Sequence, residues 1–189
     1  SAQPITTKPD VMYHCSRNGY IVLFGTGKYL GNSDFSDTST QSMYGIWDYG
    51  DITDASEYLG EISRNSLPNR SNQPEVVTLL EQLQVTQDAS GTNGLRVMSE
   101  NAATWSVVQE TTTGEKPYPS NVSSNHAGWF FDLPISKERI VRDVLIRNGV
   151  AIVISTIPSA SPCTAGGESI LHELDACSGS RLEYAQFDT

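Results

Sequence analysis

Short apolar segments separated by turn residues are the feature that most constrains how this chain folds. They are rich in β-branched and aromatic residues, as in YIVLF at Tyr20–Phe24, SMYGIWD at Ser42–Asp48 and VAIVISTI at Val150–Ile157. Gly, Pro, Asn, Asp and Ser fill the stretches between them. This punctuated pattern is typical of β-strands rather than helices. The sequence therefore predicts an all-β fold.

One segment supports two interpretations. Leu79–Thr86 alternates apolar and polar residues towards its end, which predicts a strand, and Leu95–Ser99 follows a Gly-rich turn as its hairpin partner. The competing interpretation is a helix over Pro74–Gln84, where apolar residues also recur at helical spacing. We expect the strand. The remaining expected strands are Trp105–Gln109, Gly128–Leu133, Ile140–Ile146, Ser169–Ala176 and Arg181–Phe187.

A polar stretch from Thr111 to Ala127, rich in Pro, Ser and Asn, divides the strands into two groups. We expect a single domain over residues 1–189, with a first blade group at about 11–110, a second at 127–189 and a surface loop at 111–126. Antiparallel sheets repeated in this way predict part of a β-propeller-like domain, and the Trp47-Asp48 pair at a strand end is reminiscent of propeller blades. Since two blades cannot close a ring, the alternative is an independent β-sandwich.

The charge balance excludes one class of partner. Lys and Arg total 12 against 22 for Asp and Glu, a net charge of −10, so a nucleic-acid backbone would be repelled. No apolar stretch approaches the roughly 20 residues of a membrane-spanning helix. Residues 1–7 lack the charged and apolar regions of a signal peptide, so we expect that any export signal has been removed or lies upstream.

Two glycine- or oxygen-rich loops invite a ligand-binding interpretation. Gly25-Thr26-Gly27-Lys28 fails the phosphate-loop pattern, which needs Gly at Val22 and Ser or Thr at Tyr29, so we expect a tight turn. Asp34 and Asp37 lie in an oxygen-rich loop whose spacing departs from an EF-hand. Turn capping by these side chains is the expectation, and calcium binding the competing hypothesis.

No catalytic pattern stands out. His14, His126 and His172 lie far apart, and neither a nucleophile elbow nor a marked carboxylate pair occurs. Alternation places His172 on the face of Ile170 and Leu174, which predicts a partly buried structural histidine. We therefore expect no enzyme and no catalytic, cofactor-binding or metal-ligating residue. The candidates for a binding surface are Asp34, Asp37, Tyr118 and Trp129, because exposed loops and aromatic residues commonly form such surfaces.

Three cysteines are present, without the spacing of a zinc site. Cys163 and Cys177 flank a Gly-rich loop and a strand-like segment, which favours a disulfide between them over two buried free thiols. Cys15 would then be free, or its partner would lie outside this sequence.

Four blocks resemble, in order and spacing, the C-terminal propeller region of the PilC/PilY family of type IV pilus biogenesis factors and tip-associated adhesins. They are FGTGKYLGNSDFSDTSTQSMYGIWD (24–48), GWFFDLP (128–134), KERIVRDVLIRNGVAIVIS (137–155) and ISTIPSASPCTAGGESILHELDACSGSRL (154–182). The resemblance implies an exported, non-enzymatic protein of the bacterial periplasm, outer membrane, pilus tip or cell surface. Its implied partners are pilins or minor pilins and a host or abiotic surface.

The resemblance also limits what is carried over. The family's Asp-rich calcium loop is not reproduced in this chain, so no cofactor or metal ligand is assigned. The expected function is a surface-exposed pilus biogenesis and adhesion module that binds through its loops, from Gly31 to Gln41 and from Thr111 to Ala127. The alternatives are a secreted hydrolase acting on carbohydrate, with two carboxyl groups in a cleft, and a purely structural β spacer domain.

Overall fold

A computed structural model describes residues 3–17, 19–48, 64, 78–87, 96–105, 126–159 and 167–183. These residues form an all-β fold without an α-helix, as predicted, and none of their helices is long and apolar enough to span a membrane. The strands are β1 Asp10–Tyr13, β2 Tyr20–Gly25, β3 Ser42–Asp48, β4 Thr78–Glu81, β5 Gln84–Gln87, β6 Arg96–Met98, β7 His126–Asp132, β8 Leu145–Arg147, β9 Val150–Pro158 and β10 Gly167–Asp175, with one 3₁₀ helix, η1, at Asn32–Ser36.

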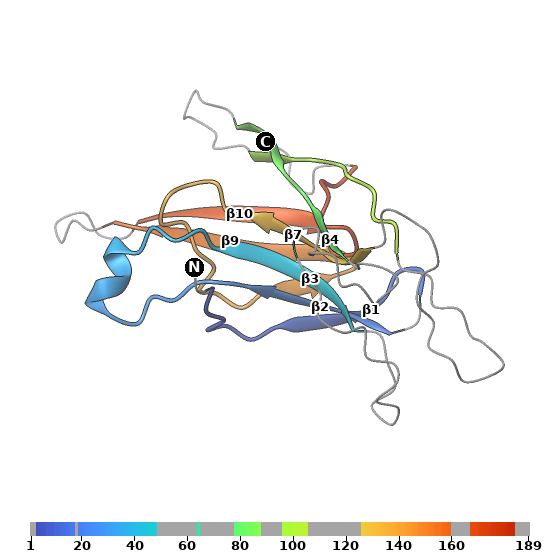
Figure 1. Ribbon diagram of the computed structural model, residues 1–189, viewed down its shortest axis with the longest axis horizontal. Helices are drawn as coiled ribbons and strands as arrows, with labels where there is room; N and C mark the ends of the chain where they lie inside the picture. Colours follow the sequence, from blue (N-terminus) through green and yellow to red (C-terminus); the bar gives the residue numbers. More distant parts are fainter. Residues whose placement is uncertain are drawn as a thin grey trace, which may run out of the picture.

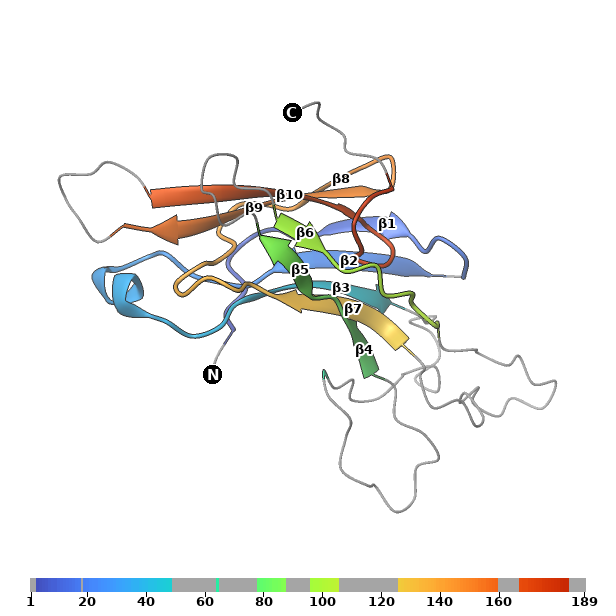
Figure 2. The same cartoon turned by 90° about the horizontal axis from the view of Figure 1, so that it is seen from above.

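Two sheets face each other, and a separate hairpin lies over one side of this sandwich (Figures 1 and 2). The larger sheet has five strands in the order β1-β2-β3-β7-β4, and the smaller has three in the order β10-β9-β8. The hairpin is β5–β6. Every described pair is antiparallel except β4–β7, which is parallel. The prediction of antiparallel sheets is confirmed.

The described part of Leu79–Thr86 is extended, so the strand interpretation is confirmed and the helix is wrong. The segment is nevertheless two strands. Its first part joins the five-stranded sheet as β4, and its second pairs with β6 as the expected hairpin. The break falls at Gln82, whose buried side-chain amide donates to the carbonyl oxygens of Asn101 and Ser178, both at 2.8 Å. Buried polar groups need such partners.

Three other expectations are corrected or only partly tested. A strand over Ile140–Ile146 is wrong for most of its length: only Leu145–Arg147 is extended in a ladder, because Ile140 turns into the core beside Gly25. The short strand β1 was not expected. Trp105 and Arg181, the first residues of the predicted strands Trp105–Gln109 and Arg181–Phe187, each form a single β-bridge. Most of the other residues of these two segments lie outside the described residues.

Strand β7 belongs to the expected second blade group. It nevertheless lies between β3 and β4, which belong to the expected first group. The two expected groups therefore share one sheet rather than forming one each. The expected surface loop at 111–126 lies outside the described residues apart from His126, which begins β7.

The core lies between the two sheets and is centred on β7. Trp129 and Phe131 are fully buried there and their rings stack, with centroids 6.4 Å apart. Glycines make room for the indole: a Cβ at Gly45 would lie 2.4 Å from the Trp129 ring, and one at Gly179 would lie 2.3 Å from it. The indole N–H donates to the carbonyl oxygen of Ala176 at 3.2 Å. Trp129, one of the two largest side chains of the core, is thus both packed and hydrogen-bonded.

A disulfide joins Cys15 to Cys177, with their Cα atoms 6.2 Å apart. The expected Cys163–Cys177 bridge is therefore wrong, and Cys163 lies outside the described residues. Spacing along the chain favoured the nearer cysteine. In the fold, the turn after β1 and the turn after β10 meet, which brings together residues 162 positions apart.

Replacement of Gly45 by Ala is expected to lower the free energy of unfolding by about 1 to 3 kcal/mol, because the new methyl group overlaps the buried Trp129 ring. Gly31→Ala is the matched control, since a Cβ there meets nothing within 4 Å. Urea unfolding of the oxidised protein measures both. Equal midpoints for the two variants would contradict the packing described.

Paired replacement of Cys15 and Cys177 by Ser is expected to cost about 3 to 5 kcal/mol of stability, because the bridge closes a long loop in the unfolded chain. The wild-type protein in reducing agent should lose a similar amount. Denaturant midpoints with and without reductant make the comparison. A double variant whose midpoint equals that of the oxidised wild-type protein would contradict the stabilisation assigned to this bridge.

Candidate binding surface

The five-stranded sheet is apolar on both of its faces. Along β2, Ile21 and Leu23 point into the core, whereas the residues that alternate with them point outward. The register continues the outward set across the sheet: Phe24 lies opposite Tyr44, which lies opposite Phe130. The outward-facing apolar residues are Val11, Tyr13, Tyr20, Val22, Phe24, Tyr44, Ile46, Leu79 and Phe130. We call this set the outer face. A sheet with one solvated face normally carries polar residues there, so this composition marks a contact surface.

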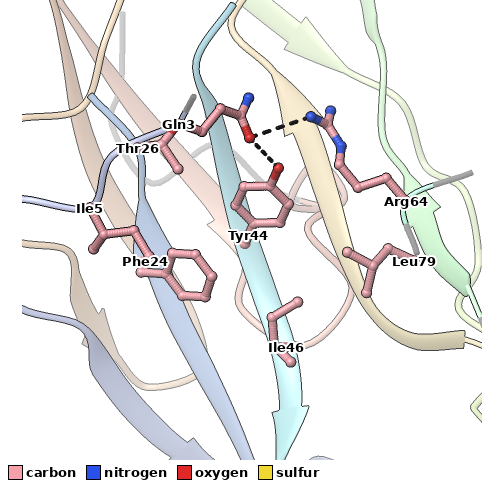
Figure 3. A pocket seen from close by; sticks show the side chains of 8 residues that line it. All are labelled: Gln3, Ile5, Phe24, Thr26, Tyr44, Ile46, Arg64 and Leu79. Atoms are coloured by element: carbon pink, nitrogen blue, oxygen red, sulfur yellow. Dashed lines mark hydrogen bonds between the residues drawn. The ribbon is translucent and has the colours of Figure 1, made fainter. Parts of the chain in front are cut away.

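A pocket of about 320 Å³ opens on the outer face (Figure 3). Its floor and one wall are formed by Phe24, Tyr44 and Ile46 from the neighbouring strands β2 and β3. The N-terminal segment contributes Gln3 and Ile5, and β4 contributes Leu79. Arg64, from the chain between β3 and β4, completes the lining. The other lining residue is Thr26.

The rim of the pocket is a closed polar network. The Tyr44 hydroxyl donates to the side-chain oxygen of Gln3 at 2.5 Å, and Arg64 approaches the same oxygen at 3.5 Å (Figure 3). The Arg64 guanidinium lies 4.1 Å from the centroid of the Phe130 ring and is paired with Asp132. The side chain therefore gains a cation–π contact and an ion pair at once.

The described lining of the pocket is mostly apolar and aromatic. Burial raises the pKa of Tyr44, which keeps its phenol neutral. None of the described residues that line the pocket is a carboxylate, whereas a glycoside hydrolase needs a pair of them. Across the described residues, no three His, Cys, Asp or Glu side chains are grouped to hold a metal ion. The stacked rings of Phe24 and Tyr44, 5.2 Å apart, offer a surface for an apolar or aromatic group.

Residues 28–41, which we call the rim loop, leave the end of β2 and are held in place by Arg139. Its guanidinium donates to three backbone carbonyl oxygens of the loop, those of Lys28, Asp34 and Asp37, at 2.8 to 2.9 Å. Gly27 adopts the expected positive φ, +140°, but residues 26–29 form no hydrogen-bonded turn, so the expected tight turn is not found. The loop is therefore fixed by the body of the protein.

Asp34 and Asp37 cap turns within the rim loop, as expected from the sequence. The Asp34 carboxylate accepts hydrogen bonds from the backbone N–H groups of Leu30 and Gly31, and that from Leu30 is the main cause of its lowered pKa. Hydrogen bonds from Ser39 lower the pKa of Asp37. Asp34 is buried, so other residues of the loop face the solvent.

Two large apolar side chains are exposed on the rim loop among its polar residues. Leu30 is 82 % exposed and Tyr29 is 42 % exposed, and the Tyr29 ring meets the Phe35 ring edge-on at 5.1 Å. Large apolar side chains held outward on a rigid loop are a feature of protein-binding surfaces.

A buried polar cluster lies between the sheets. The Ser155 hydroxyl donates to Glu138 Oε1 at 2.5 Å and lies 3.0 Å from His172 Nε2. Arg96, from the β5–β6 hairpin, makes a bidentate pair with Glu138 at 2.8 and 3.0 Å. Burial alone would raise the pKa of Glu138, but hydrogen bonds from His172, Arg96 and Ser155 and the Arg96 charge lower it to about 2.

This cluster contains serine, histidine and a carboxylate, but its arrangement is structural. Ser155, Glu138 and His172 are at most 4 % exposed, so a substrate has no path to the hydroxyl. The serine also stands between the acid and the histidine, whereas a nucleophilic triad places the histidine between them. The expectation of a buried structural His172 is confirmed. The cluster ties the hairpin to the sandwich.

His14 is held as a neutral ring beside the disulfide. Its Nδ1 accepts backbone hydrogen bonds from Ser16 and Arg17, at 3.1 and 2.9 Å, which leaves the ring proton on Nε2. The ring packs against Trp47 and Trp105, with centroids 4.9 and 4.3 Å away. Burial, with a smaller contribution from the Arg17 charge, lowers the pKa of His14 to about 4.

Of the four residues predicted from the sequence to form a binding surface, only Asp34 and Asp37 lie in the rim loop. Trp129, expected to be exposed, is fully buried, because β7 is an interior strand and the smaller sheet covers the face on which the indole lies. Tyr118 lies outside the described residues. Asp34 and Asp37 do lie in the rim loop, yet as caps. The four candidates are not brought together.

Several functional candidates were missed. Tyr29 and Leu30 directly precede Gly31–Gln41, the loop that was predicted to bind. Two large apolar residues beside a Gly-rich segment were the sequence signal that could have identified them. The unbroken apolar runs of β2 and β3 also signalled a sheet covered on both faces. For Gln3 and Arg64, no sequence signal placed them beside Tyr44.

Comparison with known proteins gives consistent matches. The family described as "PilY1 beta-propeller domain" matches residues 1–81. The type IV pilus biogenesis factor PilY1 of Pseudomonas aeruginosa strain PAO1 is 28% identical over 194 residues, covering 100% of this chain and 15% of the relative. That of strain UCBPP-PA14 is 30% identical over 197 residues, covering 98% and 15%. A PilY1 homolog of Xylella fastidiosa is 26% identical over 183 residues, covering 94% and 10%.

A solved structure shares the fold. The crystal structure of the Pseudomonas aeruginosa PilY1 C-terminal domain superimposes with a TM-score of 0.65 and 28% sequence identity. The match covers 97% of this chain and 34% of that chain. The chain thus spans 15% or less of the length of the curated relatives named above and about a third of the solved domain.

Stability is expected to fall as the pH is lowered from 6.5 to about 4, in part because of His14. The pKa of His14 is about 4 in the folded protein and 6.5 for an ordinary histidine, so between these pH values the unfolded chain binds the proton more tightly. The neutral His14 therefore contributes its full stabilisation only above pH 6.5, and this stabilisation is lost as the pH falls towards 4. Asn at position 14 keeps an acceptor without titrating. The wild type should lose about 2 kcal/mol more than His14→Asn across this range, measured by urea unfolding.

His126, whose burial also lowers its pKa, and Glu138 titrate in both proteins and cancel in the comparison. Parallel stability curves for the wild type and His14→Asn between pH 4 and 6.5 would refute the assignment to His14.

Proposed function

Because the chain belongs to the PilY1 β-propeller family, we propose that it is part of a type IV pilus biogenesis factor and that it acts by binding proteins or surfaces, without catalysis. The observation that carries this proposal is the match of essentially the whole chain to proteins named as type IV pilus biogenesis factors. The described site agrees with it, since the pocket and rim loop offer apolar contacts and the buried Ser155 cluster is closed to substrate.

The outer face has a structural role in this proposal. A propeller packs blade-like sheets face to face, and the family of this chain is described as a propeller domain. Val11, Tyr13 and Tyr20, which are 50, 75 and 43 % exposed, would then pack against the next sheet of the same domain, whereas Tyr44 and Phe130 are already buried within this chain. This explains why a sheet with apolar residues on both faces is stable in water.

The rim loop is the proposed recognition element. Packed sheets leave their connecting loops at the rim, and Arg139 holds this loop rigid, which reduces the entropy lost when a partner binds. Leu30 and Tyr29 supply the apolar contacts. We propose pilins or minor pilins as the partners in assembly, and a host or abiotic surface as the partner in adhesion.

The proposed location is outside the cytoplasm, in the periplasm or at the cell surface. The Cys15–Cys177 bridge supports it, because disulfides persist in oxidising compartments. The net charge of −10 is compatible with this location. A purely structural spacer is the competing function. It predicts that substitutions in the rim loop leave piliation and attachment unchanged.

Leu30→Asp in the full-length protein, expressed in its piliated host, is expected to reduce surface piliation or attachment at least tenfold, because it places a charge in the apolar contact. Val85→Asp is the matched control: Val85 is also exposed, at 61 %, but lies on the β5–β6 hairpin. Pilus counts by electron microscopy and adherent cells per area are the measurements.

Both variants should reach wild-type levels in the cell envelope, which immunoblotting checks. Normal piliation together with normal attachment for Leu30→Asp would remove the rim loop from recognition and favour the spacer function.

A further inference from the structure

The two ends of the Cys15–Cys177 bridge differ in their access to solvent. Cys15 is exposed, as are Ser16 and Arg17, which follow it in the turn after β1. Cys177 is half-buried and follows Ala176, which is fully buried. The rate of thiol–disulfide exchange at a sulfur depends on whether a reagent can reach it. A thiol or disulfide from solution therefore reaches Cys15 more easily than Cys177.

The charges beside the two cysteines also differ. Arg17 lies two residues after Cys15, and its charge contributes to the lowered pKa of His14 in the same turn. A positive charge favours a thiolate, which is the form of cysteine that attacks a disulfide. The turn that contains Cys177 instead holds the Asp175 carboxylate, which accepts two hydrogen bonds there. Charge and access thus favour Cys15 as the nucleophile.

Hydrogen bonds hold the turn of Cys15 independently of the bridge. The His14 N–H donates to the carbonyl oxygen of Gly19 at 3.0 Å. The Nδ1 atom of His14 also accepts the backbone N–H groups of Ser16 and Arg17, at 3.1 and 2.9 Å. These bonds are made by residues on both sides of Cys15, so its position does not require the sulfur–sulfur bond.

The turn of Cys177 is closed in the same way. The Asp175 N–H donates to the carbonyl oxygen of Ser180 at 2.9 Å, and the Gly179 N–H donates to that of Asp175 at 2.8 Å. The Ser178 N–H donates to the Asp175 carboxylate at 2.7 Å. Both turns therefore stay formed when the bridge is open, and the fold holds the two thiols together before the bond forms.

We propose that Cys15 is the thiol through which this bridge is made and opened in the folded protein, by exchange with an external disulfide. The Cys15 thiolate attacks that disulfide, forms a mixed disulfide and expels one external thiolate. The Cys177 thiolate then attacks Sγ of Cys15, forms the intramolecular bridge and expels the second external thiolate. The two electrons and two protons that the cysteines lose reduce the external disulfide to two thiols.

Opening of the bridge by an external thiol retraces these steps, because the forward and reverse reactions share the mixed disulfide at Cys15. The turn of Cys15 precedes β2 and the rim loop follows it, so the two lie at opposite ends of that strand (Figure 1). The exchange therefore changes the stability of the module and leaves the rim loop in place. It goes beyond the role in pili, and its test does not need a pilus.

The test uses full-length protein as two variants, Cys177→Ser and Cys15→Ser, each of which leaves one thiol of the pair. Both lack the bridge, so each is the matched control for the other. Both also carry Cys163→Ser, so that the remaining thiol cannot pair with the third cysteine of this chain. Each is incubated with glutathione disulfide without denaturant, and mass spectrometry of its peptides locates the adduct. The adduct at Cys15 should form at least tenfold faster than the adduct at Cys177.

Urea separates the effect of the fold from that of the local sequence. In urea the two adducts should form at rates within threefold of each other, because both sulfurs are then equally accessible. Reduced protein that retains Cys15 and Cys177 is the second sample. Without denaturant it should form the bridge with at least tenfold less mixed disulfide at Cys15 than in urea, because the second thiol is already in position.

A second arm identifies the source of the external disulfide. An oxidised thiol–disulfide oxidoreductase of the cell envelope replaces glutathione disulfide in the reaction with the Cys177→Ser variant. A covalent adduct of that enzyme at Cys15 would support a protein donor. Reaction with glutathione disulfide alone would support a small donor, and in both cases Cys15 is the thiol that exchanges.

Three results would overturn the proposal. One is an adduct that forms at Cys177 as fast as at Cys15, or faster, in the absence of denaturant. Another is accumulation of the mixed disulfide at Cys15 in undenatured protein that retains both cysteines, which would mean that the turns separate once the bridge opens. The third is loss of the near-ultraviolet circular dichroism of the protein on reduction, because the exchange requires the reduced protein to stay folded.

Discussion

The insertion of β7 between β3 and β4 is the constraint on which the rest of the structure depends. It places Trp129 and Phe131 on the inward side, where the smaller sheet covers them, and Phe130 on the outward side beside Tyr44. One strand therefore supplies both the core and the pocket region. The glycine at position 45 is part of the same constraint, because the indole occupies the space that a Cβ would take.

Polar groups in this protein fix elements in place. Arg139 reaches from the chain before β8 to three carbonyl oxygens of the rim loop, and Arg96 reaches from the hairpin to Glu138 between the sheets. Each guanidinium satisfies several acceptors at once, which an ammonium group does not do with the same geometry. The apolar residues that remain exposed, such as Leu30 and Leu171, are then held on rigid supports.

Local patterns were sufficient to predict most of the strands and the caps of the rim loop, because alternation and capping act over a few residues. Ser42–Asp48, the β5–β6 hairpin, the capping by Asp34 and the burial of His172 follow from such patterns. Contacts between distant segments were not predictable in this way. Trp129 was misplaced and Cys177 was paired with the wrong cysteine, because each outcome depends on which strands become neighbours. The same limit hid the approach of Arg64 to Tyr44.

The bridge between Cys15 and Cys177 also has a mechanical consequence. It joins two positions separated by 162 residues, and nearly all of both sheets lies between them. Tension applied to the chain on either side of these cysteines passes through the sulfur–sulfur bond and does not peel apart the strands that lie between them. The module can transmit a pulling force while its surfaces keep their shape.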